Sequence, residues 1–157
     1  MSLDLGPPLR ATLIGENDDA FVNTAAIRAL MPEYLGAPAV FAYRPIPDDT
    51  PSLVIMINPD AAISDADGLT SDRPIVQRDI IVYGRKGTPG DPSDDSPKVE
   101  QLGFLIRELF HRKKFSVRPE GYSVIDVVAT GPVVAPVDDD GEIGRLVSLT
   151  VRLRRKP

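Results

Sequence analysis

The chain has 157 residues, of which 42% are hydrophobic, enough for a single core that buries about two-thirds of the surface the unfolded chain exposes. It has no cysteine, so disulfides and thiolate metal sites are excluded. The net charge is -5, but residues 1 to 142 carry -10, whereas residues 143 to 157 carry five basic residues and no acidic one. Because nucleic-acid affinity comes mostly from neutralising phosphates, the acidic body disfavours nucleic acid as a partner. We expect one domain, 1 to 157.

Membrane insertion is not expected. No apolar run approaches the roughly 18 residues needed to span a bilayer. The first ten residues, MSLDLGPPLR, also lack a basic region followed by an apolar stretch. These features favour a cytoplasmic protein without a membrane partner.

Two helices are predicted before the first strand. Leu9, Leu13 and Ile14 form a short apolar stripe, and a longer helix follows, which Pro32 ends. Asn17, Asp18 or Asp19 is available to cap the longer helix. Its apolar positions at helical spacing are Phe21, Val22, Ala25, Ala26, Ala29 and Leu30.

The middle of the chain predicts three strands. Segments 40 to 46 and 53 to 57 are separated by a run rich in proline and aspartate, which favours a hairpin. The second segment, LVIMI, is apolar on both faces and is expected in the centre of a sheet. Residues 58 to 73 are expected to form a long loop, and residues 75 to 83 a third strand.

Glycines and prolines then predict a loop over residues 84 to 95, followed by the clearest helix of the chain, over residues 97 to 112. Ser96 can cap this helix, and Pro97 suits its first position. The expected inward side chains are Val99, Leu102, Ile106, Leu109 and Phe110.

Two strands, residues 122 to 129 and 145 to 155, complete the chain. The segment Asp138-Asp139-Asp140-Gly141 between them is typical of a hairpin turn. In the last strand, Val147, Leu149, Val151 and Leu153 alternate with polar residues, so one face is expected to be buried. The order of elements predicts an α+β fold of two layers, with a mostly antiparallel sheet of about five strands packed by the helix over 97 to 112 and by the N-terminal helices.

The sequence contains no motif with a clear catalytic mechanism. The only histidine, His111, follows a helix and is surrounded by cations, so it is interpreted as a solvated residue rather than a general base. Two acidic stretches, near Gly68 and Gly141, lack the first and last ligands of a calcium loop. The glycine-rich run from Gly84 to Gly90 lacks the Gly-Lys-Ser/Thr ending of a phosphate-binding loop. We therefore expect no catalytic residue, metal or cofactor.

Charged residues provide candidates for an interaction surface. Arg145, Arg152 and Arg154 either contact an acidic partner or protect an exposed strand edge from aggregation, and the sequence leaves both interpretations open. If copies of the chain associate, acidic loops would complement this basic strand. The remaining candidates come from the glycine-rich loop: Arg85, Lys86, Asp91, Asp94 and Asp95.

Several segments together resemble the small tail-completion, or tail-terminator, proteins of phages, prophages and gene-transfer elements. They are the N-terminal helical stretch, VFAYRPIPDDTPSLVIMIN, RDIIVYGRKGTPGDPSDD, SPKVEQLGFLIRELFHR and GYSVIDVVATGPVVAPVDDDGEIGRLVSLTVRLRR, which cover most of residues 8 to 155. The long loop over residues 58 to 73 departs from that pattern.

The resemblance implies a structural protein without catalytic residues. It would form a ring, typically of six copies, at the head-proximal end of a tail tube, contacting tube and head-tail connector proteins. Its place would be the cytoplasm of a bacterial host or a virion or phage-like particle. Two other hypotheses stay open: a ligand-binding or accessory domain with a pocket between the helix over 97 to 112 and the sheet, and a hydrolase or transferase that uses acidic loops to hold Mg²⁺.

Overall fold

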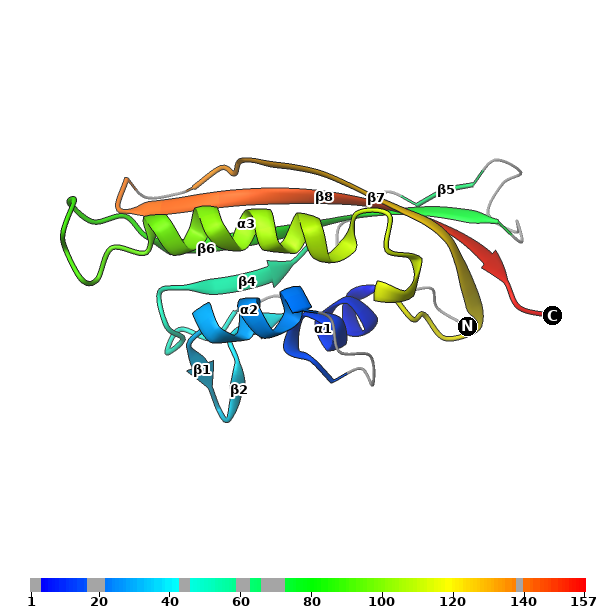
Figure 1. Cartoon of the computed structure of the whole chain (residues 1–157), viewed down its shortest axis with the longest axis horizontal. Helices are drawn as coiled ribbons and strands as arrows, with labels where there is room; N and C mark the ends of the chain where they lie inside the picture. The colour runs from blue at the N-terminus through cyan, green and yellow to red at the C-terminus, as the bar shows by residue number, and fades with distance from the viewer. Residues whose placement is uncertain (1–3, 17–21, 43–45, 59–62, 66–72, 138–139) are drawn as a thin grey trace.

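A computed structural model describes residues 4–16, 22–42, 46–58, 63–65, 73–137 and 140–157. Three α-helices lie on one face of a sheet whose strand order is β3-β4-β6-β8-β7, with β5 paired to the beginning of β6 (Figure 1). The predicted α+β class with a mostly antiparallel sheet is confirmed. The elements of this layer pair are α1 (Gly6–Ile14), α2 (Val22–Leu30), α3 (Ser96–Phe110), β3 (Val40–Phe41), β4 (Val54–Ile57), β5 (Ile63–Asp65), β6 (Pro74–Arg85), β7 (Tyr122–Val134) and β8 (Glu142–Arg155).

The position of helix α3 and the face that it buries are close to those predicted from the sequence. Its five expected inward side chains are all at most 2% exposed. The N-cap is Asp95 rather than Ser96, because the backbone nitrogen and the hydroxyl of Ser96 both donate to the Asp94 carboxylate. The helix ends at Phe110, two residues earlier than predicted, and His111 is its C-cap.

The inward face of α2 differs from the prediction. Ile27 is fully buried and Thr24 nearly so, whereas Ala25 and Ala29 are exposed. Burying an isoleucine removes more apolar surface from water than burying an alanine, so the helix turns Ile27 to the core. The expected caps, Asn17 to Asp19, lie outside the described residues.

Strands β6, β7 and β8 form a long antiparallel ribbon. The β6–β8 register runs without interruption from the pair Ile75 and Arg152 to the pair Arg85 and Glu142. The predicted alternation in β8 is confirmed, since its four expected core residues, Val147, Leu149, Val151 and Leu153, have no exposed surface. Strand β7 pairs antiparallel with β8 as expected, although Asp138 and Asp139 of the predicted turn lie outside the described residues.

The hairpin predicted for residues 40 to 57 is wrong. β3 and β4 are neighbours, but they run parallel, with Val40 opposite Ile55. Parallel neighbours need a crossover of about a dozen residues, and the segment from residue 42 to residue 53 supplies that length. The position of β4 inside the sheet is correct, because it pairs with both β3 and β6 and is buried on both faces.

Two predicted loops are shorter than expected. Residues 63–65 of the region 58 to 73 form β5, and Gly84 and Arg85 belong to β6. A small hairpin that the sequence did not reveal joins β1 (Glu33–Tyr34) to β2 (Ala37–Pro38) through Leu35 and Gly36, both with positive φ. It projects from the layer that contains α1 and α2 (Figure 1).

A second, smaller core lies on the face of the sheet opposite the helices. It contains the buried side chains of Met56, Ile81 and Ala135, with Ile46, Tyr83 and Leu146 packed against them. No helix in the described part of the chain is long and apolar enough to span a membrane.

Candidate interaction surface

The charged residues predicted as an interaction surface fall into three separate places. The five loop candidates lie together at one end of the molecule, where β6 leads into α3, and the chain's C-terminus lies at the other end (Figure 1). Arg145 lies on the helix-covered face of β8, whereas Arg152 and Arg154 point to the opposite face. Arg145 and Arg154 are nine residues apart in one strand, which corresponds to about 30 Å. They do not form one patch.

Asp94 holds the loop between β6 and α3 together. Its Oδ1 accepts hydrogen bonds from the backbone nitrogens of Gly87 (3.0 Å) and Ser96 (3.1 Å) and from the Ser96 hydroxyl (2.6 Å). The hydroxyl of Ser96, followed by the two backbone donors, holds the pKa of Asp94 below its usual value, because all three favour the charged carboxylate. Asp94 therefore acts within the loop, joining its beginning to the first turn of α3.

Asp91 and Asp95 are engaged in a similar way. Asp91 Oδ1 accepts from the backbone nitrogen and the hydroxyl of Ser93, which lowers the pKa of Asp91. Asp95 Oδ2 accepts from the backbone nitrogen of Arg85 at 2.8 Å and from the Ser52 hydroxyl at 2.7 Å. The aspartates of this loop thus bind backbone and hydroxyl donors, while Arg85 and Lys86 are exposed.

Gly84 and Gly87 allow the loop to approach this closely. A Cβ on Gly84 would lie 2.6 Å from Cβ of Asp95, and one on Gly87 would lie 2.8 Å from Cβ of Asp94. These glycines, which lie in the run that lacks the ending of a phosphate-binding loop, provide room for the aspartates.

Arg145 joins β8 to α3. Its guanidinium forms an ion pair with Glu100 of α3, with 2.9 Å between Nη2 and Oε1. The Arg145 side chain is 20% exposed, so most of it is covered. Its place under the helix indicates a role in holding the two layers together.

Arg152 and Arg154 lie on the open face of the sheet. Arg152 lies opposite Asp126 in the register of β8 and β7. The ion pair of Asp126 is with Arg112. For Arg152 the interpretation as protection of an exposed strand edge is wrong, because β6 and β7 both pair with β8 at this residue. The β6 register ends at Arg152, so Arg154 pairs with β7 alone among the described strands. Together with Arg155 and Lys156, these two arginines make a basic end on the molecule.

Strand β7 is the edge of the sheet, and the end of α3 covers part of it. The backbone nitrogen of Arg112 donates to Val127 O at 2.8 Å. His111 Nδ1 accepts from the backbone nitrogen of Ala129 at 3.1 Å. His111 is half-buried, so its interpretation as a solvated residue is wrong; it satisfies an edge donor of β7.

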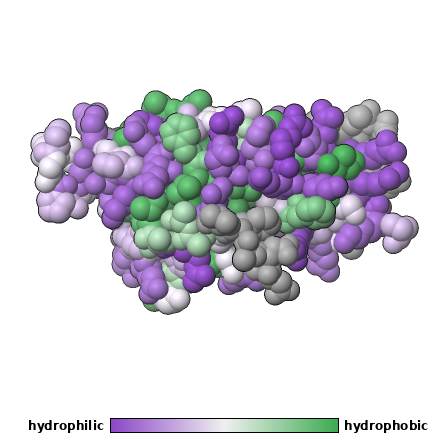
Figure 2. All heavy atoms as spheres, viewed as in Figure 1, coloured by the Kyte–Doolittle hydropathy of each residue, from purple (hydrophilic) through white to green (hydrophobic). Residues whose placement is uncertain are grey.

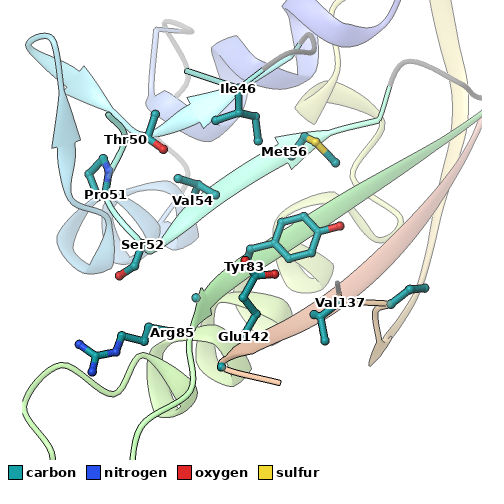
Figure 3. A pocket seen from close by; sticks show the side chains of 13 residues that line it. Ile46, Thr50, Pro51, Ser52, Val54, Met56, Tyr83, Arg85, Val137 and Glu142 are labelled. Atoms are coloured by element: carbon teal, nitrogen blue, oxygen red, sulfur yellow. The ribbon is translucent and has the colours of Figure 1, made fainter. Parts of the chain in front are cut away.

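A groove that the sequence did not reveal lies on the open face of the sheet. Its volume is about 830 Å³. Figure 3 shows Ile46, Met56 and Tyr83 around one space, although they come from three segments, with Val137 from a fourth. Arg85 and Glu142, which are opposite each other in β6 and β8, also line it. The only sequence signal was the apolar character of both faces of β4.

Large apolar side chains are also exposed elsewhere. Figure 2 shows apolar atoms along the margin of the molecule where the end of β7 lies beside α3. Exposed apolar surface of this kind is common at contacts with other proteins. The exposed large hydrophobic residues among those described are Leu35, Phe104, Phe115, Ile125, Val133, Val134 and Val137.

The described residues offer no metal centre, since no three His, Asp or Glu side chains among them come together in a way that could hold an ion. The two acidic stretches tested as calcium loops fall partly outside these residues.

No family model and no curated protein matches the sequence. A solved structure does match the fold. It is a chain from a structure described as the virion of a native gene transfer agent particle, with a TM-score of 0.62 and 12% sequence identity. The match covers 98% of this chain and 99% of the other. The two chains share one fold. At this identity the similarity concerns the fold, and the description names the particle rather than the role of the matched chain.

Proposed function

We propose that this protein is a structural assembly protein of a phage-like particle, and specifically a tail terminator that forms a ring at the head-proximal end of the tail tube. The observation that carries the proposal is the end-to-end match to a chain of a gene transfer agent particle. Because nearly all of both chains are covered, the similarity extends beyond a common supersecondary motif. The tail-terminator role and the ring of six follow from the resemblance of the sequence segments.

The distribution of charge supports self-association in a ring. The basic end of the molecule, with Arg152 and Arg154, lies far from the end that carries the β6–α3 loop, so the molecule has two unlike ends (Figure 1). When two different patches of the same chain contact each other, the association is head-to-tail and gives a ring if the rotation closes. In this proposal the tail tube and the head-tail connector are the further partners.

The proposal includes no enzymatic activity. Support comes from the residues that could have provided chemistry: His111 accepts a backbone hydrogen bond, and Asp91 and Asp94 hold their own loop. The groove near Tyr83 has no histidine among its lining residues.

The test is the molar mass in solution by light scattering, over a range of protein concentration and at low and high salt. Six chains of 17.0 kDa give about 102 kDa. A mass near this value, with ring-shaped particles in electron micrographs, would support the proposal. Closed particles of another shape or a stable monomer, also when a tail-tube protein is added, would contradict it.

The groove favours a second candidate, a ligand-binding or accessory domain. Its apolar floor with a few polar residues at the rim is typical of a small-molecule site. The sequence-based hypothesis expects a pocket between α3 and the sheet, but the inward side chains of α3 are fully packed there. The observed groove lies elsewhere, on the opposite face of the sheet. Binding of small apolar compounds that raises the melting temperature and is lost in Val137→Glu would favour this candidate.

A further inference from the structure

Leu35 is an unusual residue for the turn that it occupies. It lies at the tip of the β1–β2 hairpin with a φ of +51° and is 88% exposed. Left-handed backbone is unfavourable for a residue with a Cβ, and turns with two positive φ values favour Asn-Gly. Leucine therefore suits neither the backbone nor the solvent, which indicates a role outside the folded monomer.

The hairpin is firmly attached behind its tip. The Tyr34 hydroxyl donates to Asp49 Oδ1 at 2.9 Å, and the Tyr34 ring contacts Phe41 edge-on with 5.7 Å between centroids. At the tip, a Cβ on Gly36 would meet no atom within 4 Å. Leu35 is thus presented to its surroundings by a supported turn.

The groove on the open face of the sheet is largely apolar, so it can accept the apolar side chain of Leu35. Ile46, Tyr83 and Val137 offer partly exposed apolar surface around the groove, Met56 is buried beneath it, and Arg85 lies at its edge (Figure 3). Its volume of about 830 Å³ exceeds what one leucine side chain needs, so the hairpin backbone beside Leu35 can enter as well. The Leu35 of the same chain does not line the groove.

Charge can orient the contact. The groove carries one basic and one acidic side chain, Arg85 and Glu142, which lie opposite each other in β6 and β8, and Glu33 on the hairpin suits the side of Arg85. Glu33 on the hairpin and Arg85 at the groove are both exposed, and neither forms an ion pair within 4.0 Å with a described residue. Opposite charges at the rim of a contact steer and align the partners.

We propose that the hairpin tip of one copy docks in the groove of the next copy, with Leu35 against Ile46, Tyr83 and Val137 and with Glu33 toward Arg85. This inference rests on the proposed self-assembly and names the surfaces that carry it. The two surfaces are different, so each copy uses both, and the contact propagates head-to-tail around a ring.

The first test is Leu35→Asn, with Phe115→Asn as the matched control. Asparagine suits a positive φ before glycine, so the hairpin is kept while the apolar contact is removed. We expect the association constant, measured by sedimentation, to fall about 10- to 100-fold for Leu35→Asn, as expected for exposing one buried leucine, and to stay unchanged for Phe115→Asn.

The second test uses the absence of cysteine in the chain. A Leu35→Cys protein mixed with a Val137→Cys protein should give a disulfide-linked pair under mild oxidation, whereas a mixture of Leu35→Cys with Phe115→Cys should not. Efficient linkage of Leu35→Cys to itself, without linkage to Val137→Cys, would indicate a two-fold contact and overturn the proposal.

The third test is charge reversal. Glu33→Arg and Arg85→Glu should each weaken association, and the two changes together should restore part of it. If wild-type protein assembles and Leu35→Asn assembles equally well, this inference is overturned while the ring is unaffected. If wild-type protein remains monomeric also when a tail-tube protein is added, both are overturned.

Discussion

Gly103 of α3 lies directly against Pro132 of β7: a Cβ on Gly103 would be 2.9 Å from Cβ of Pro132. Glycine inside a helix usually costs about 1 kcal/mol relative to alanine. Here the added methyl would meet a rigid ring rather than a movable side-chain end, and overpacking of this kind costs about 1 to 3 kcal/mol. The close approach of α3 and β7 therefore depends on this glycine.

Gly103→Ala should accordingly destabilise the protein, by about 1 kcal/mol after the helix-propensity gain is subtracted. Urea unfolding at equilibrium measures the change, and Gln101→Ala at an exposed position of α3 is the control, expected within about 0.5 kcal/mol of wild type. A Gly103→Ala protein more stable than wild type would show that β7 can move away from the helix.

The ion pair between Glu100 and Arg145 should contribute modestly to the free energy of unfolding. Its Nη2 to Oε1 distance is short, but Glu100 is 59% exposed, and pairs open to solvent contribute about 0.2 to 1 kcal/mol. A double-mutant cycle with Glu100→Gln and Arg145→Gln should give a coupling energy in this range that decreases with added salt. No coupling at low salt would mean that Arg145 acts through packing alone.

Regular periodicity explains which parts of the fold could be predicted. In α3 the period of 3.6 residues, and in β8 the period of two, assigned the apolar inward side chains correctly, because burial of one face follows directly from spacing. Helix α2 lacked such a clear pattern: its alanines suggested one face, but the single isoleucine, Ile27, decided which side is buried.

The pairing of β3 with β4 could not be predicted in the same way. Two paired residues on β3 carry too little pattern to give a direction, and prolines between two strands are compatible with a turn or with a crossover. The small β1–β2 hairpin was missed because its turn begins with leucine instead of the asparagine or aspartate that usually precedes glycine.

The candidate interaction surface was predicted only in part. The sequence located the charged residues of the β6–α3 loop, but spacing does not show that Asp94 accepts hydrogen bonds from Gly87 and Ser96 rather than facing a partner. The groove draws side chains from four segments, including Ile46 and Val137, which are far apart in sequence. Only the fold brings them together.

His111 should stabilise the protein through the hydrogen bond that its Nδ1 accepts from the Ala129 backbone nitrogen. His111→Ala should lower the free energy of unfolding by about 1 kcal/mol, the usual contribution of one such bond. His111→Asn should retain most of this stabilisation, because the side-chain oxygen of asparagine can take the place of Nδ1. Amide exchange of Ala129 should be faster in the alanine variant alone, and equal exchange in both variants would contradict the role given to His111.

Asp94 should make the stability of the β6–α3 loop dependent on pH. The Ser96 hydroxyl and the backbone nitrogens of Gly87 and Ser96 lower the pKa of Asp94 in the folded protein. A carboxyl whose pKa is lower in the folded state than in the unfolded state stabilises the fold fully above its unfolded pKa, and this stabilisation is lost as pH falls through the folded pKa.

Asp94→Ala should therefore lower the urea midpoint clearly at neutral pH, and the difference from wild type should shrink once the pH falls below the usual aspartate range of about 4. Glu120→Ala, at an exposed carboxylate, is the control and should change little at any pH. If the wild-type advantage over Asp94→Ala stayed constant between neutral and strongly acidic pH, the charge of Asp94 would not be what secures the loop, and its hydrogen bonds would have to form equally well with the neutral acid.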